Sequence, residues 1–487
     1  MTEPQTLLGI DLGTSSVKVV LTDATGTILD QATESYTVDR PQPGWAETDP
    51  HAWWLAITHA VQRLNGGAGA GRPVGIGLSG QMHGVVLCDD HGAPVRPAVL
   101  WCDARAEPQL DLYRLPAHVH ARLRNPLAAG MAGPELAWLH QHEPQVVETA
   151  RWALQPKDWI RSLLTGRYAA EPSDASATLL YDVIAQDWDE VVVSALGIRR
   201  ELLAPILTDA AATAGSLIEE AADQLGIAAG IPVAAGAADT AAAALGTGLL
   251  APGRTQLTIG TGVQIVRIVM PPDSSPVRDP VTHLYRDATP TGWYAMAASL
   301  SGGQTLDWVR AVLGTSWAEL YASANREPRR DDPIFVPHLV GERTPYLNSG
   351  LRGSWTGLGA GHDRTALLYS ALEGVAFATC DALRALPAGP EPQTALILAG
   401  GGTTSPAWRS LLADVLNRPL DAVQVPSASA RGAGLLAAQA AGLVDRNDLP
   451  AVAQLAANRV AEPGRRADLL HERWDSYRRV LSRLASP

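Results

Sequence analysis

A single carboxylate, that of Asp239, lies in a run of small apolar residues, VAAGAADTAAAALG (233–246). Reading outward from Asp239, the nearest charged residues are Asp223 and Arg254. Burying an ionised Asp is costly unless a partner pairs with it or its basicity serves a reaction. The segment is typical of a strand that runs into a helix, whose N-terminus would also favour the charge. A general base and a helix cap are therefore the two interpretations of Asp239.

Two glycine–threonine turns have the composition of phosphate-binding loops. The first, Asp11-Leu-Gly-Thr-Ser-Ser16, offers Gly13 for close backbone approach and donors from Thr14 onward. Asp11 could hold a hydrated Mg²⁺ beside the phosphates, although a plain hairpin turn fits the same residues. The second turn, Gly260-Thr261-Gly262, also follows an apolar strand. Two equivalent turns facing each other would clamp a polyphosphate from both sides.

Two further loops could contact a nucleotide or a substrate. In Ala399-Gly-Gly-Gly-Thr403, three consecutive glycines are entropically costly to order, so close approach of the backbone to a flat ring or a phosphate is a good reason for them. A tight turn alone would need fewer glycines. In Gly80-Gln-Met-His-Gly84, Met82 could shape a pocket and His83 could present its imidazole to a polar substrate. A hydrogen-bonded structural histidine is the alternative for His83.

Alternating strands and helices must position these loops, and their pattern indicates an α/β fold. Apolar stretches separated by turns predict three initial strands, at 7–11, 17–22 and 27–35. TQLTIGTGVQIVRIV, around residue 255, repeats the strand, Gly-Thr turn and strand of LLGIDLGTSSVKVVL, which indicates a duplicated fold. PGR at 252–254 precedes the second copy, so we place a domain boundary near it.

Three helices have recognisable starts or apolar faces. Asp49 and Pro50 predict the cap and first residue of one helix, and another is expected from about Arg364 to Leu386. Ser405 and Pro406 predict the start of a third, with an apolar face formed by Trp408, Leu411, Leu412 and Val415.

Composition and charge narrow the class of protein. A chain of 487 residues with 46% hydrophobic residues suggests at least two domains, and a net charge of −12 argues against binding to nucleic acid or an anionic membrane. Cys88, Cys102 and Cys380 lack metal-binding or CxxC spacing, which favours buried thiols in a reducing compartment. The N-terminus has no signal-peptide pattern, and no apolar run reaches the ~18 residues that span a bilayer. We therefore expect a cytoplasmic protein.

Eight motifs occur in the order in which the carbohydrate kinases of the FGGY family have them. They are GIDLGTSSVKVVL, GWAETDPHAWW, GLSGQMHGVVL, LWCDAR, LQPKDWIRSLLTG, AAGAADTAAAALG, GERTP and LAGGGTTSPAW. The resemblance extends from about Leu7 to about Ala440. Within the family, the motifs resemble those of xylulokinases most.

The resemblance implies two ribonuclease-H-like, actin-like ATPase domains with a cleft between them, at 1–250 and 251–487. The first domain would bind the sugar, and the second would bind most of ATP with Mg²⁺. Asp239 matches the family's catalytic base by position, and Met82 and His83 match the pair that contacts the ketose. Asp11, Gly13 and Thr14 match the first phosphate loop, and Gly260 and Thr261 match the second. Gly401 and Gly402 match the adenosine loop. Gly303 and Asp307 match a further contact with the nucleotide.

The implied reaction is ATP-dependent phosphorylation of the terminal hydroxyl of a ketopentose, D-xylulose to D-xylulose 5-phosphate. Asp239 would accept the hydroxyl proton as the oxygen attacks the γ-phosphorus, and domain closure would exclude water. Its charge-free surroundings should raise its pKa, unless the helix N-terminus opposes this. Ribulose, a deoxy sugar or a polyol are alternative acceptors, and an actin-like ATPase that acts through a protein partner is a further alternative. A homodimer is left open.

Three residues depart from the family pattern. Thr240 follows the predicted base, where xylulokinases usually have Asn. Glu135 stands where a Lys commonly precedes an apolar-x-Trp group, which is a charge reversal, and Arg431 stands where small residues are usual. None of them replaces Asp239, so the departures bear on the identity of the sugar rather than on phosphoryl transfer.

Overall fold

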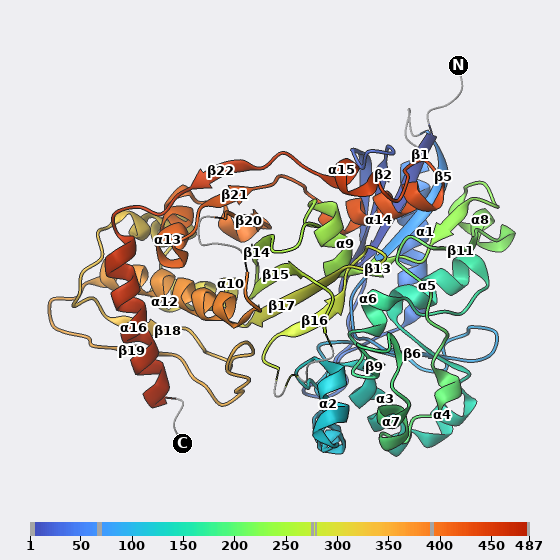
Figure 1. Cartoon of the computed structure of the whole chain (residues 1–487), viewed down its shortest axis with the longest axis horizontal. Helices are drawn as coiled ribbons and strands as arrows, with labels where there is room; N and C mark the ends of the chain where they lie inside the picture. Colours follow the sequence, from blue (N-terminus) through green and yellow to red (C-terminus); the bar gives the residue numbers. More distant parts are fainter. Residues whose placement is uncertain (1–4, 66–70, 274–276, 278–279, 390–393, 485–487) are drawn as a thin grey trace.

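Two seven-stranded sheets form the centres of the two halves of the molecule (Figure 1). The structure, a computed structural model, describes residues 5–65, 71–273, 277, 280–389 and 394–484. Blue strands from the start of the chain and green strands from residues 213–238 build the first sheet, and yellow to red strands build the second (Figure 1). Each sheet is covered by helices, as the α/β pattern predicted.

The first sheet has the strand order β11-β12-β5-β1-β2-β3, with β13 pairing to β5. The strands β1, β2 and β3 are antiparallel, whereas β5, β12 and β13 continue the sheet parallel to β1. Their bounds are Gln5–Leu12 (β1), Ser16–Thr22 (β2), Ile28–Ser35 (β3), Arg72–Gly80 (β5), Thr213–Ser216 (β11), Pro232–Ala234 (β12) and Ala237–Ala238 (β13).

The second sheet repeats this plan, with the order β16-β17-β15-β14-β20-β21-β22. The strands β14, β15 and β17 form the antiparallel part, and β20 and β21 run parallel to β14. The bounds are Thr255–Ile259 (β14), Val263–Val269 (β15), His283–Arg286 (β16), Trp293–Ser299 (β17), Leu396–Ala399 (β20), Leu420–Ala422 (β21) and Asn458–Ala461 (β22). The Gly-Thr turns therefore occupy equivalent places, between β1 and β2 and between β14 and β15.

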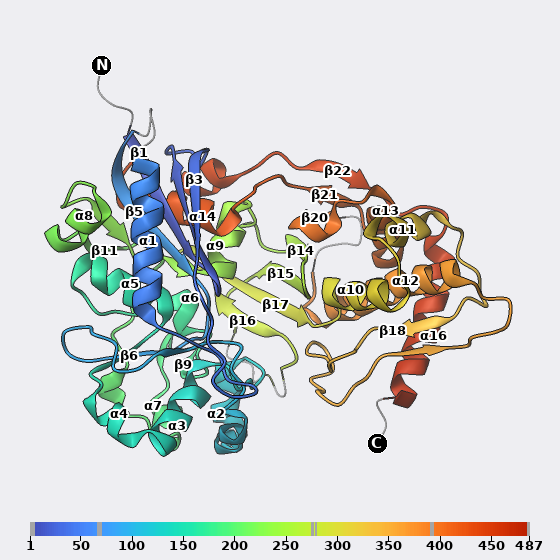
Figure 2. The same ribbon diagram turned by 180° about the vertical axis from the view of Figure 1, so that it is seen from behind.

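Two helices cover opposite faces of the first sheet. In Figure 1 the helix α14 (Ala428–Ala440) lies in front of the sheet, and in Figure 2, seen from behind, α1 (Pro50–Asn65) lies in front. Glycines let α14 approach closely, since a Cβ on Gly77 would lie 1.9 Å from the carbonyl oxygen of Ala433. The chain thus returns to the first sheet after building most of the second. The domain ranges 1–250 and 251–487 stay a prediction, because α14 belongs to the first sheet in space.

The helices with predicted starts are present. The amide of His51 donates to Oδ1 of Asp49 (3.0 Å) at the start of α1, and Ser405 caps α13 (Pro406–Leu416). The helix α12 (Arg364–Ala385) ends one residue before the predicted position. By length and composition alone α12 could cross a membrane, but 94% of its apolar window is buried inside the protein. It is therefore the core helix of the second half.

The remaining elements are short or lie outside the two sheets. The other helices are α2 (Ala117–Leu123), α3 (Ala132–His142), α4 (Pro144–Thr149), α5 (Pro156–Thr165), α6 (Pro172–Ala175), α7 (Glu190–Ala195), α8 (Glu219–Leu225), α9 (Asp239–Gly246), α10 (Gly303–Val312), α11 (Trp317–Ala322), α15 (Leu449–Ala453) and α16 (Ala467–Leu484). The other strands are β4 (Glu47–Thr48), β6 (Val86–Cys88), β7 (Ala98–Val99), β8 (Trp152–Leu154), β9 (Tyr181–Asp182), β10 (Asp187–Trp188), β18 (Ile334–Val336) and β19 (Ser354–Thr356). All three cysteines are free thiols, and Cys88 and Cys380 are buried.

Candidate functional site

Asp11 and Asp239 meet at one edge of the first sheet. Asp11 is paired with Ser79 in the parallel register of β1 and β5, and Ala238, the residue before Asp239, is paired with Gly80 at the end of β5. Because the carboxyl ends of parallel strands share an edge, the two carboxylates flank β5. The hydroxyl of Ser79 donates to Oδ1 of Asp11 (2.9 Å). Burial raises the pKa of Asp11, while this hydrogen bond and Lys18 oppose the rise.

Asp239 is the first residue of α9, and its side chain does not cap the helix. The cap position is Ala238, whose amide donates to the hydroxyl of Ser173 (2.8 Å). The carboxylate of Asp239 instead accepts a hydrogen bond from the hydroxyl of Thr240 (3.1 Å). Burial and the charge of Asp11 raise its pKa to about 6, and hydrogen bonds from Thr240 oppose the rise. The raised pKa is a property expected of a base rather than of a cap.

The first Gly-Thr turn is held by side chains from distant segments. The carbonyl oxygen of Gly13 accepts hydrogen bonds from the hydroxyl of Tyr36 (2.5 Å) and from Nε2 of Gln81 (3.2 Å). The indole of Trp101 donates to the hydroxyl of Thr14 (2.9 Å). These partners fix the loop and were not predicted, because the sequence carries no sign of contacts over such separations.

The second Gly-Thr turn is built against the start of α10. The amide of Gly303 donates to the carbonyl oxygen of Gly260 (2.9 Å), and that of Gln304 donates to the carbonyl oxygen of Thr261 (2.9 Å). A Cβ on Gly303 would lie 2.4 Å from the carbonyl oxygen of Gly260, so glycine is needed there for packing. Gly260 and Thr261 are exposed. Asp307 is also exposed, and it forms an ion pair with Arg310 on the same helix (2.7 Å).

The glycine cluster after β20 divides into structural and open positions. Gly400 has φ +81°, and a Cβ on Gly402 would lie 2.2 Å from the carbonyl oxygen of Ile259. Gly400 is therefore required by the turn, and Gly402 by the packing of the turn on β14. The turn and its packing thus need more glycines than we expected of a tight turn alone. Gly401 is exposed, and a Cβ there would meet no atom within 4 Å. Only Gly401 is left without a packing reason.

Met82 and His83 lie where the two halves of the molecule meet. The sulfur of Met82 is 4.0 Å from the hydroxyl of Tyr294 on β17, and the ring of His83 is 6.1 Å from that of Tyr285 on β16. His83 has φ 74°, and its Nδ1 is 2.7 Å from the carbonyl oxygen of Ala177. Burial lowers the pKa of His83 to about 4, so the imidazole is neutral near pH 7.

A buried ionic network supports the backbone at Asp239, and sequence reasoning missed it. The hydroxyl of Ser173, which accepts the amide of Ala238, donates to Oε1 of Glu171 (2.6 Å). Lys157 is fully buried, and its Nζ lies 3.1 Å from the same Oε1, 2.6 Å from Asp158 and 3.0 Å from Asp174. Burial opposes the ammonium, but the three carboxylates outweigh it and raise the pKa of Lys157. Lys157 and Asp158 within LQPKDWIRSLLTG, and Glu171 and Asp174 shortly after it, were the available signal.

Two of the departures from the family pattern have structural roles. Glu135 is buried in α3, and in the described part of the chain neither carboxylate oxygen has a hydrogen-bond partner. Burial and Asp103 raise the pKa of Glu135 well above its usual value, while Arg105 and Arg96 oppose the rise, so burial disfavours the charged form of this carboxyl. Arg431 on α14 donates to the carbonyl oxygens of Gly246 (2.7 Å) and Ala453 (3.0 Å). It therefore ties the end of α9 to α14 and α15.

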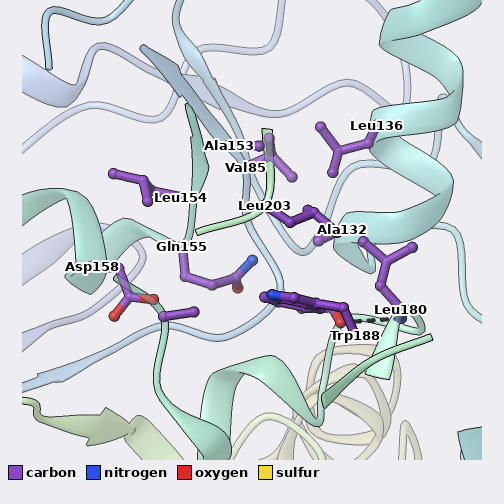
Figure 3. A pocket seen from close by; sticks show the side chains of 12 residues that line it. Val85, Ala132, Leu136, Ala153, Leu154, Gln155, Asp158, Leu180, Trp188 and Leu203 are labelled. Atoms are coloured by element: carbon purple, nitrogen blue, oxygen red, sulfur yellow. Dashed lines mark hydrogen bonds between the residues drawn. The ribbon is translucent and has the colours of Figure 1, made fainter. Parts of the chain in front are cut away.

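A small pocket in the first half contains none of the predicted site residues (Figure 3). Its walls are mainly apolar side chains such as Val85, Leu136 and Leu203, and its polar members include Gln155 and Asp158. Asp158 also belongs to the Lys157 network, so this pocket borders that network. We assign no ligand to it.

The comparisons with known proteins agree with the geometry. Models of the FGGY family of carbohydrate kinases match residues 6–246 (N-terminal domain) and 257–441 (C-terminal domain). The xylulose kinase of Escherichia coli (strain K12) is 35% identical over 85% of each chain, and that of Lactococcus lactis subsp. lactis (strain IL1403) is 32% identical over 90% of this chain and 88% of the relative.

Solved structures resemble the whole chain. A structure described as a xyloylose kinase from Brucella ovis is 31% identical, has a TM-score of 0.90 and covers 98% of this chain and 100% of its own. A glycerol kinase from Plasmodium falciparum has a TM-score of 0.88 at 19% identity, covering 100% of this chain and 99% of its own. The fold alone therefore does not distinguish between acceptors.

Proposed function

The chain belongs to the FGGY family of carbohydrate kinases, and we propose from that membership that its acceptor is D-xylulose, converted to D-xylulose 5-phosphate. It is an ATP-dependent carbohydrate kinase with an α/β fold of two actin-like ATPase domains, as the sequence predicted. Sugar and ATP are thus its small-molecule partners. The choice of sugar is supported by relatives that are xylulose kinases and that match this chain over most of their length.

The observation that carries the mechanism is the pair of carboxylates on either side of β5. Asp239, with a pKa of about 6, is mostly ionised near pH 7 and can accept the proton of the terminal hydroxyl as its oxygen attacks the γ-phosphorus. Its hydrogen bonds come from Thr240, and among the described residues no cation pairs with it to lower its basicity. Phosphoryl transfer then needs positioning and charge neutralisation more than covalent help.

Asp11 is the residue that would hold Mg²⁺, through water. Among the described residues there is no group of three or more His, Cys, Asp or Glu side chains that could form a metal cage. The half-buried carboxylate of Asp11 at the phosphate turn fits a cation whose other ligands are phosphate oxygens and water, as Mg²⁺ prefers. When bound, the cation neutralises charge on the phosphates.

The remaining assignments follow the positions of the loops. Met82 and the neutral His83 would contact the ketose, next to Tyr285 and Tyr294 of the second half. The two Gly-Thr turns, through Gly13, Thr14, Gly260 and Thr261, would bind the phosphates. Gly401 and Gly402 would lie against the adenosine, with Gly303 and Asp307 near the nucleotide. The cytoplasmic location, the lack of nucleic-acid and membrane partners and a homodimer stay predictions.

A panel of acceptors with ATP and Mg²⁺ tests the choice of sugar. We expect kcat/KM for D-xylulose to exceed the values for ribulose, deoxy sugars and glycerol by at least about tenfold, since a hydroxyl that is missing or has the other configuration leaves a polar group of the site unpaired, at a cost of more than about 1 kcal/mol. Equal or faster turnover of ribulose or glycerol would overturn the choice of D-xylulose. Asp239→Ala should abolish sugar phosphorylation while ATP affinity by calorimetry stays unchanged.

Asp223→Ala, on the exposed surface of α8, is the matched control for that variant. Near-normal turnover by Asp239→Ala would contradict the assignment of the base. An actin-like ATPase acting through a protein partner predicts sugar-independent hydrolysis that Asp239→Ala leaves intact.

A further inference from the structure

The hydroxyl of Thr240 joins Asp239 to the second half of the molecule. It lies 3.1 Å from Oδ1 of Asp239 and 3.1 Å from Nε2 of Gln264, which is on β15. Thr240 is 7% exposed, so water competes little for either hydrogen bond. A continuous chain of two hydrogen bonds therefore runs from the second sheet to the proposed base.

The chemistry of the partners fixes the direction of this chain. Nε2 of Gln264 also lies 3.2 Å from the sulfur of Met296, and a thioether can only accept. The amide nitrogen, which only donates, thus has one proton for Met296 and one for Thr240. Because the Thr240 oxygen accepts from Gln264, its single proton is directed to Asp239.

We propose that Gln264 is a positioning residue that acts through Thr240 to hold Asp239 in its reacting orientation. This inference rests on the proposed function of Asp239 as the base. It also gives Thr240 a defined role: its short side chain places a hydroxyl between the base and β15. Because Gln264 lies on β15 of the second sheet and Asp239 begins α9 beside the first sheet, this hydrogen-bond chain to the base exists only when the two halves hold the arrangement seen here.

The charged and titratable groups around Asp239 are few. Asp11 on β1 raises the pKa of Asp239, and Tyr294 on β17 has its own pKa raised well above its usual value, mainly by burial. On the α14 side, Arg431 binds the opposite end of α9. Glu171 and Asp174 on the α6 side are paired with Lys157. Loss of the Thr240 hydrogen bond would therefore not be replaced by a cation.

Removing the hydroxyl should change both the pH profile and the plateau rate. Thr240→Val keeps the shape but not the donor, so the acid limb of kcat/KM should move up by about one pH unit and the plateau kcat should fall about tenfold. Gln264→Leu should produce a smaller shift in the same direction. Thr240→Ser retains the hydroxyl and should restore the position of the acid limb.

A double variant separates this role from a merely structural one. If Gln264 acts through Thr240, Thr240→Val with Gln264→Leu should have the profile of Thr240→Val alone. Gln256 and Thr247 provide a matched control, because they also form a Thr–Gln hydrogen bond, in which the hydroxyl of Thr247, next to the far end of α9, donates to Oε1 of Gln256 on β14 (2.8 Å). Gln256→Leu and Thr247→Val should leave the acid limb in place.

The proposal is overturned if the limb does not move in Thr240→Val, if the two variants are additive, or if the control pair moves the limb equally. These results are distinct from failure of the proposed function. The profiles are measured with whichever acceptor the panel identifies, so a different sugar does not affect them. Retained turnover in Asp239→Asn would contradict the assignment of Asp239 as the base. If only the role of Gln264 and Thr240 fails, Asp239→Asn should still be inactive.

Discussion

At the scale of single residues, Asp239 combines a proposed catalytic role with an electrostatic penalty for the fold. Its pKa rises from 3.8 to about 6, chiefly through burial and then through Asp11. The folded protein therefore binds this proton more tightly than the unfolded chain does between these values. As a result, the stability that protonation contributes is lost as the pH rises from about 4 to about 6.

The variant Asp239→Asn removes this charge and should therefore be more stable than the wild type at pH 7. One pKa unit corresponds to about 1.4 kcal/mol, and a variant rarely gains the full free energy that the pKa shift implies. We therefore expect the free energy of unfolding to rise by about 1–2 kcal/mol. Urea unfolding at pH 7 and near pH 4 measures it, and the difference should shrink at the lower pH. Lower stability of Asp239→Asn at pH 7 would contradict the electrostatic interpretation. Asp223→Asn is the control.

The part of the site that could be predicted consists of residues that belong to a short, recognisable motif in the sequence. Asp239, Asp11 and the Gly-Thr turns stand out because a strand, a small residue and a donor follow one another along the chain. Gln264 and Ser173 do not, since their partners lie 24 and 65 positions away and neither belongs to a recognisable motif. The packing role of Gly402 was equally invisible, because it depends on a carbonyl oxygen of another strand.

At the scale of elements, α14 shows how glycines in strands allow a helix to lie directly on a sheet. A Cβ on Gly9 would lie 2.2 Å from the carbonyl oxygen of Ala430, and α14 also packs on α9 through Gly432. The strands themselves were predictable from apolar stretches bounded by turns. The helix that covers one of their faces was not predictable, because α14 follows β1 by about four hundred positions.

Gly77→Ala should destabilise the protein by about 3 kcal/mol, because overpacking forces the backbone of α14 away from β5. A Cβ there would lie 1.9 Å from the carbonyl oxygen of Ala433, whereas one on Gly361 would meet no atom within 4 Å. Thermal unfolding of Gly77→Ala and of the matched control Gly361→Ala measures the difference. Equal stability of the two variants would show that α14 does not pack as described.

At the scale of the whole molecule, two sheets of equivalent order are joined so that the first half of the sequence does not contain the whole of the first half of the structure. Residues 1–250 include the whole first sheet but not α14, which covers β1 and β5. Arg431 adds hydrogen bonds from α14 to the end of α9. The two halves are therefore interdependent in folding as well as in catalysis.

A fragment of residues 1–250 should not fold cooperatively, since the faces of β1 and β5 under α14 would be open to water. We expect a broad thermal transition by circular dichroism and aggregation at micromolar concentration, in contrast to the full chain. Extending the fragment with a linked copy of residues 424–456 restores α14 and α15 and should sharpen the transition. A sharp transition in the unextended fragment would contradict this interdependence.

The late position of α14 also sets a timetable for synthesis on the ribosome. At about 5–20 residues per second, roughly 10–40 s separate the emergence of residue 250 from that of residue 440. During that interval the first sheet is translated in full while one of its apolar faces has no helix to cover it. The nascent chain therefore offers that face to chaperones for most of the time in which its second half is being made.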